Sequence, residues 1–128
     1  MLRVGNLDKS IDFYSRVLGM TVHRNNEYPD GGFTNVFVGF GELEKDPSIE
    51  ITYNWDQEED YDKGNSWGHL AIMVPDVAET CEYLKSEGVT ITRPAGPMKN
   101  GKRMLAFIED PDGYKIELNE TLEKLAKD

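Results

Sequence analysis

The sequence predicts an α+β fold built from two copies of a βαβββ module, and three observations support this. A strand, turn and helix pattern ending in glycine occurs twice, over residues 2–19 and 68–88. Each copy then closes with a strand that carries one carboxylate among apolar residues, Glu50 in the first and Glu117 in the second. The chain has 128 residues, of which 38% are hydrophobic, which suits one compact domain. We therefore expect a single domain over 1–128, with modules at 1–55 and 67–128 joined by an acidic linker at 56–66.

The first module begins with a short strand and an amphipathic helix. The helix is expected from about Lys9 to Leu18, because apolar residues recur at helical spacing there. Asn6 or Asp8 would cap its first turn, and Gly19 would end it. The strands of this module are predicted at Leu2–Val4, Met20–Arg24, Phe33–Phe40 and Ser48–Asn54.

The second module repeats this order. Asp76 is its expected helix cap and Gly88 its stop. A tight turn is predicted at Asp110–Gly113, where proline fixes one φ and glycine supplies a positive one. A short terminal helix is expected over Thr121–Lys127. The strands are predicted at Gly68–Val74, Thr90–Thr92, Met104–Glu109 and Tyr114–Asn119.

Composition excludes several classes of partner. The formal net charge is -10, so nucleic acid and anionic membrane surfaces are disfavoured, since phosphates require Lys and Arg for neutralisation. The one cysteine, Cys81, cannot form an internal disulfide, and we expect it to be buried and inert. The sequence has no apolar run long enough to cross a bilayer. A cytoplasmic location is the expectation.

Three residues are candidates for metal chemistry. Side chains alternate between the two faces of a strand, so Glu50 and Glu117 point away from their isoleucine neighbours, and His69 opens the second module. Taken singly, each carboxylate fits a solvated outer face and His69 fits a structural histidine. His23 has no partner in the repeat and is interpreted as a surface residue. The symmetry of the repeat favours a functional role over a purely structural one, because both carboxylates occupy equivalent places in the two copies.

The repeat also predicts a residue outside the sequence. The helices are offset by about 70 positions, which places the counterpart of His69 two residues before Met1. Two histidines and two glutamates related by an internal twofold would give a four-ligand site for a divalent metal, with positions left for water or substrate.

A series of longer motifs runs through nearly the whole chain: Met-Leu-Arg-Val at 1–4, Ser-Ile-Asp-Phe-Tyr at 10–14, Val-Leu-Gly-Met at 17–20, Glu-Ile-Thr-Tyr-Asn-Trp at 50–55, Gly-His-Leu-Ala at 68–71 and the run 106–118. In sequence and in order these motifs resemble glyoxalase I, the lactoylglutathione lyases of the short bacterial type, in the vicinal-oxygen-chelate superfamily.

The resemblance implies paired βαβββ modules and a homodimer whose metal ligands come from both subunits. Glu50, His69 and Glu117 match three of the family's ligands, and the fourth is a histidine at the place that the repeat marks before Met1. Arg3 and Asn54 match residues that hold the glutathione part of the substrate. The loop with Lys99, Lys102 and Arg103 would add local positive charge.

The implied reaction isomerises the hemithioacetal of methylglyoxal and glutathione to S-lactoylglutathione. Glu117 would be the proton-transferring base and Glu50 the second catalytic carboxylate. Ni(II) is the preferred metal, with Co(II) or Zn(II) as alternatives. The main rival function is a small-molecule binding protein of the same fold with weakened or no metal binding. A thiol transferase and a ring-cleaving dioxygenase fit less well, the latter because only one histidine is convincing.

Overall fold

The computed structural model describes residues 1–123 as two compact units, 1–63 and 64 onward. The division falls inside the acidic stretch 56–66, and whether the chain behaves as one domain stays a prediction. Of the terminal helix expected over Thr121–Lys127, Thr121 is not helical, Leu122 and Glu123 are helical, and residues 124–127 lie outside the described residues. No helix in the described part of the chain is long and apolar enough to cross a membrane.

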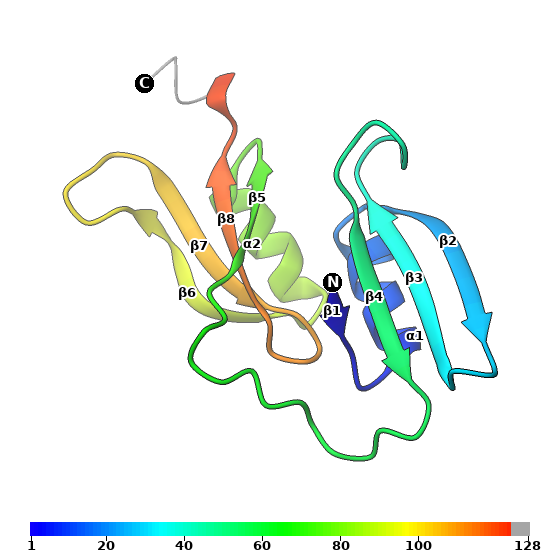
Figure 1. Ribbon diagram of the computed structural model, residues 1–128. Coiled ribbons are helices and arrows are strands. Elements are labelled where there is room, and N and C mark those ends of the chain that lie inside the picture. Colours follow the sequence, from blue (N-terminus) through cyan, green and yellow to red (C-terminus); the bar gives the residue numbers. More distant parts are fainter. Residues whose placement is uncertain (124–128) are drawn as a thin grey trace. The chain divides into compact units, whose positions relative to one another are not determined.

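The first unit is one four-stranded sheet with a helical segment between its first two strands (Figure 1). The strand order is β1-β4-β3-β2, with β1 parallel to β4 and the other neighbours antiparallel. Val4, Tyr14, Val36 and Ile51 are completely buried and form the centre of its core. Its elements are β1 (Leu2–Arg3), α1 (Leu7–Asp12), the π-helical turn η1 (Phe13–Val17), β2 (Thr21–Tyr28), β3 (Phe33–Gly39) and β4 (Ile49–Asn54).

The second unit repeats this topology. The strand order is β5-β8-β7-β6, with β5 parallel to β8 and the rest antiparallel. Leu84, Ile108, Ile116 and Leu118 are completely buried. The predicted βαβββ order is confirmed in both units. The elements are β5 (Leu70–Val74), α2 (Val77–Ser86), β6 (Thr90–Pro97), β7 (Met104–Glu109) and β8 (Lys115–Glu120).

Both helices begin with the same kind of cap. Asn6 Oδ1 accepts a hydrogen bond from the backbone N–H of Lys9 at 3.1 Å, and Asp76 Oδ1 accepts one from Glu79 at 2.8 Å. Each side chain satisfies a backbone donor that has no partner within the first turn. Asn6 is therefore the cap rather than Asp8, and α1 begins earlier than predicted, at Leu7.

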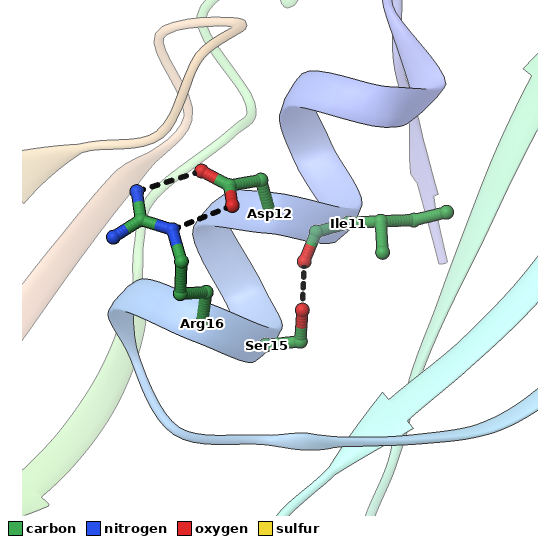
Figure 2. A network of polar contacts seen from close by, with 4 residues as sticks. All are labelled: Ile11, Asp12, Ser15 and Arg16. Atoms are coloured by element: carbon green, nitrogen blue, oxygen red, sulfur yellow. Dashed lines mark hydrogen bonds and ion pairs between the residues drawn. The ribbon is translucent and has the colours of Figure 1, made fainter.

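The first helix changes from α to π geometry at its end (Figure 2). The Ser15 hydroxyl donates to the carbonyl of Ile11, and Arg16 donates from Nε and Nη2 to the two Asp12 oxygens at 2.7 and 2.9 Å. The bonds from Arg16 lower the pKa of the Asp12 carboxyl. Gly19 then ends the segment at a φ of +84°, a conformation that glycine adopts at little cost.

The edge strands are longer than the sequence predicts. The strands expected at 20–24 and 90–92 extend to Tyr28 and Pro97. The strand β6 runs through Pro94, lies at the edge of its sheet and skips in register between Arg93 and Gly96. Proline is tolerated at edges and bulges because no ladder donor is lost there. The Arg93 guanidinium donates to the carbonyls of Gly96 and Leu105 at 3.1 and 2.7 Å, which stabilises the irregular segment.

Candidate metal and active site

The second unit brings two of the predicted site residues into contact. His69 Nε2 lies 3.0 Å from Glu117 Oε2. Glu117 is in the middle of β8, paired with Ala71 on β5 and Phe107 on β7. His69 directly precedes β5, which begins at Leu70 rather than at Gly68, and its ring meets Phe107 edge-on at 5.2 Å between centroids. An imidazole and a carboxylate thus share one face of this sheet.

The other carboxylate oxygen of Glu117 has its own partner. Asn119 Nδ2 donates to Glu117 Oε1 from two residues further along β8, on the same face of the strand. Asn119 is buried, at 6% exposure, and the Glu117 side chain is 19% exposed. Glu117 is therefore not the freely solvated carboxylate that an outer sheet face would carry.

A tight turn leads the chain into β8. The buried Asp110 accepts hydrogen bonds at Oδ1 from the backbone N–H groups of Asp112 and Tyr114, both at 2.9 Å. Gly113 donates to the Asp110 carbonyl and takes a φ of +83°. The turn predicted from the sequence is present. Its bonds fix the start of β8 and hence the position of Glu117.

The first unit holds Glu50 differently. Asn35 on β3 donates from Nδ2 to Glu50 Oε1 at 3.0 Å, and its own Oδ1 accepts from the Thr52 hydroxyl at 3.0 Å. Asn35 is paired directly with Thr52 across the β3–β4 ladder. Sequence reasoning missed both Asn35 and Asn119. The position of Asn119 two residues after Glu117 was an available clue, whereas Asn35 needs the strand register.

The residues expected to hold glutathione lie on the same sheet as Glu50. Arg3 is paired with Thr52 across the parallel β1–β4 ladder, so its side chain is on the face that carries Glu50 and Asn54. Arg3 is exposed, and Asn54 Nδ2 donates to the Tyr61 hydroxyl at 2.9 Å.

The basic loop between β6 and β7 is separate from these residues in sequence. Lys99 and Lys102 are exposed there, and Arg103 is half-buried. The loop therefore presents positive charge to solvent in a chain whose overall charge is strongly negative.

The chemistry of the His69–Glu117 pair fits a divalent metal. Imidazole nitrogen and carboxylate oxygen are ligands of Zn(II), Ni(II) and related ions. Bonds of about 2.1 Å place two neighbouring donors of an octahedral ion about 3 Å apart, which matches the observed Nε2–Oε2 distance. Among residues 1–123 no group of three or more His, Cys, Asp or Glu side chains gathers, so the assignment of Glu50 as a third ligand stays a prediction.

His23 and Cys81 lie apart from the candidate pair. His23 is half-buried on β2, beside the register shift between Val22 and Arg24. The Cys81 thiol is free and buried, as expected, and burial raises its pKa. It lines a cavity of about 690 Å³ between α2 and β6 that contains none of the candidate ligands.

Two βαβββ sheets that carry an imidazole and carboxylates on their faces are the features of a known class of proteins. Residues 1–118 match the model of the Glyoxalase/Bleomycin resistance protein/Dioxygenase superfamily. The lactoylglutathione lyase of Neisseria meningitidis is 55% identical over 117 residues, which are 91% of this chain and 84% of the relative. The lactoylglutathione lyase of Salmonella typhimurium is 51% identical over 120 residues, 94% of this chain and 88% of the relative.

Solved structures agree. Glyoxalase I from Zea mays matches with a TM-score of 0.88 and 43% identity over 93% of this chain, which spans only 42% of the maize chain. The trypanothione-dependent glyoxalase I of Leishmania major matches with a TM-score of 0.83 and 38% identity, over 99% of this chain and 87% of the other. The chain belongs to the glyoxalase superfamily and, within it, to the lactoylglutathione lyase (glyoxalase I) family.

Proposed function

We propose that this chain isomerises the hemithioacetal of methylglyoxal and glutathione to S-lactoylglutathione at a site built from Glu50, His69 and Glu117. The observation that carries the proposal is the 3.0 Å contact between His69 Nε2 and Glu117 Oε2 on one sheet face. The lactoylglutathione lyases that the chain resembles supply the reaction class. A cytoplasmic location, expected from the sequence, is part of the same proposal.

The glyoxalase I family uses a divalent metal, and we propose Ni(II) for this chain, with Co(II) and Zn(II) as the alternatives. Glu50, His69 and Glu117 would hold the ion through carboxylate oxygens and an imidazole nitrogen. When bound, the metal supplies Lewis-acid stabilisation of the negative charge that develops on the two adjacent substrate oxygens.

Glu117 is the proposed proton carrier. It takes the proton from the carbon that bears the hydroxyl and the sulfur and returns it to the neighbouring carbon, so no electrons are gained or lost. Its position in the middle of β8 and the Asn119 contact at Oε1 keep the carboxylate in place, so Oε2 is the oxygen that would carry the proton.

Substrate binding would use the first unit. Arg3 suits a carboxylate of glutathione because a guanidinium offers two parallel donors. Asn54 shares the Arg3 face of the sheet and offers an amide that donates and accepts. Lys99, Lys102 and Arg103 would attract the anionic substrate locally.

A homodimer completes the proposal, with each site formed from Glu50 of one subunit and from His69 and Glu117 of the other.

Replacement of Glu117 by Gln tests the proposal directly. We expect turnover at saturating nickel to fall by about 10²–10⁴-fold, since a general base is lost. The exposed Glu27 is the matched control, because Glu27→Gln removes a charge in β2 and should leave turnover unchanged. Near-normal formation of S-lactoylglutathione by Glu117→Gln would remove the base role. An unmutated protein that binds glutathione conjugates without turnover would support the binding-protein alternative.

A further inference from the structure

Both candidate carboxylates are held at one oxygen by a neutral carboxamide. Asn119 Nδ2 donates to Glu117 Oε1, and Asn35 Nδ2 donates to Glu50 Oε1 at 3.0 Å. The donors come from different places, one from the same strand and the other from a neighbouring strand. The two units therefore use different residues to make the same contact.

The amide nitrogen of each asparagine faces its glutamate. Asn35 Oδ1 accepts from the Thr52 hydroxyl, which leaves the amide nitrogen to face Glu50. Asn119 is buried, and its amide nitrogen is directed at Glu117 from two residues along the same face. A carboxamide that donates to a carboxylate loses a charge-assisted hydrogen bond if that carboxylate turns away.

The two carboxylate oxygens of Glu117 have different partners. Oε1 is bound by Asn119, while Oε2 faces His69 Nε2 at 3.0 Å. An oxygen that already accepts a hydrogen bond has fewer lone pairs for a cation, so the second oxygen is presented in a single orientation. Partners that orient metal-binding side chains in this way raise metal affinity.

We propose that Asn119 and Asn35 are positioning residues that fix Glu117 and Glu50 through Oε1, so that each carboxylate offers Oε2 to one divalent cation. The inference rests on the proposed metal site and deepens it by naming what orients its two acidic ligands. Neither asparagine touches the substrate in this scheme; both act through the glutamates.

The test replaces each asparagine by leucine, which has a similar shape and no donor, in Asn119→Leu, Asn35→Leu and the double variant. Asn25→Leu is the matched control, since Asn25 is exposed on β2 and the change is the same. Nickel affinity is measured by competition with a coloured chelator. The visible spectrum of the Co(II)-loaded protein reports ligand geometry, and thermal unfolding of the metal-free protein reports fold stability.

We expect each single replacement to weaken nickel binding by about 10–100-fold, the usual cost of losing such a partner. Because both glutamates would bind the same ion, the two losses are coupled, and the double variant should bind nickel more weakly than either single variant. The Co(II) spectrum should change, while the metal-free protein should melt close to the Asn25→Leu control. If leucine prevents folding at either site, Asn119→Ala and Asn35→Ala give the same comparison.

Unchanged nickel affinity and an unchanged Co(II) spectrum in both variants would overturn the inference while leaving the proposed function intact. A loss of affinity that appears only together with an equal loss of thermal stability would also overturn it, because it would show a structural role. If the unmutated protein binds neither ion, the proposed metal site itself fails, and the inference fails with it.

Discussion

The two sheets place equivalent carboxylates on equivalent strands, yet surround them differently. Glu117 follows the tight turn at residues 110–114 and contacts both an imidazole and a carboxamide. Glu50 follows the longer connection at 40–48, and its contact is a carboxamide that a hydroxyl orients. The repeat thus fixes where a carboxylate lies, while its neighbours set what it does.

The largest effect expected from this comparison is a recovery of activity on mixing two inactive proteins. Glu50→Gln damages the first unit and Glu117→Gln the second. If each site takes Glu50 from one subunit and Glu117 from the other, a mixed dimer contains one site without either change. Random exchange of a one-to-one mixture should restore about a quarter of wild-type turnover.

The assay is S-lactoylglutathione formation before and after subunit exchange in mild denaturant. Each variant treated alone is the control, and neither should recover. If every site is built within one chain, the mixture stays as inactive as its components, and the shared-site model is wrong.

A smaller effect is expected from the connections that precede the two carboxylates. Asp110→Ala removes a buried acceptor of two backbone N–H groups and should cost about 2–3 kcal/mol. Asp46→Ala removes an exposed bond to the Glu42 N–H, 2.8 Å long, and should cost less than about 1 kcal/mol because water replaces the lost acceptor. Urea unfolding of both variants measures the difference. Equal losses would show that the tight turn is no more important than the open loop.

The sequence predicts the backbone of the fold well because the signals are local and repeated. Asn6, Asp76, Gly19 and Gly88 mark the helix ends in both copies, and the strand pattern follows from alternation. The extension of β6 through Pro94 was missed, because a bulge and the bonds of Arg93 make proline acceptable there. Tertiary contacts override a local breaker in this segment.

The candidate site is predictable in part. Glu50, His69 and Glu117 stand out because they recur or begin a copy, and the structure joins His69 with Glu117. Asn35 is invisible to such reasoning, since its contact depends on the register of β3 against β4. Partners of this kind are set by which residues face each other across a ladder, and periodicity does not encode that.

The two helix caps should contribute equally to stability, and a comparison of them tests how far the repeat extends. Asn6→Ala and Asp76→Ala should each cost about 1 kcal/mol, because each leaves one backbone N–H of the first turn without its side-chain acceptor. Chemical unfolding of the two variants provides the measurement. A loss at Asp76 several times that at Asn6 would indicate that the two copies are not equivalent at this position.

The smallest effect is expected at the Asp12–Arg16 ion pair drawn in Figure 2. The repeat places Glu82 and Ser86 at the equivalent positions of the second helix, which therefore lacks this pair. The Arg16 bonds lower the pKa of Asp12, so the small stabilisation that linkage predicts is present above the unfolded pKa of that carboxyl and is lost as the pH falls through the lower folded value. Arg16→Met should return the Asp12 pKa toward its ordinary value, as followed by NMR titration. The free energy of unfolding at neutral pH should not change measurably, because both side chains are more than half exposed and solvent screens them. Ser86→Arg, the reciprocal change in α2, should also leave the free energy of unfolding unchanged. A clear gain in stability in that variant would show that a surface pair at this position contributes to folding.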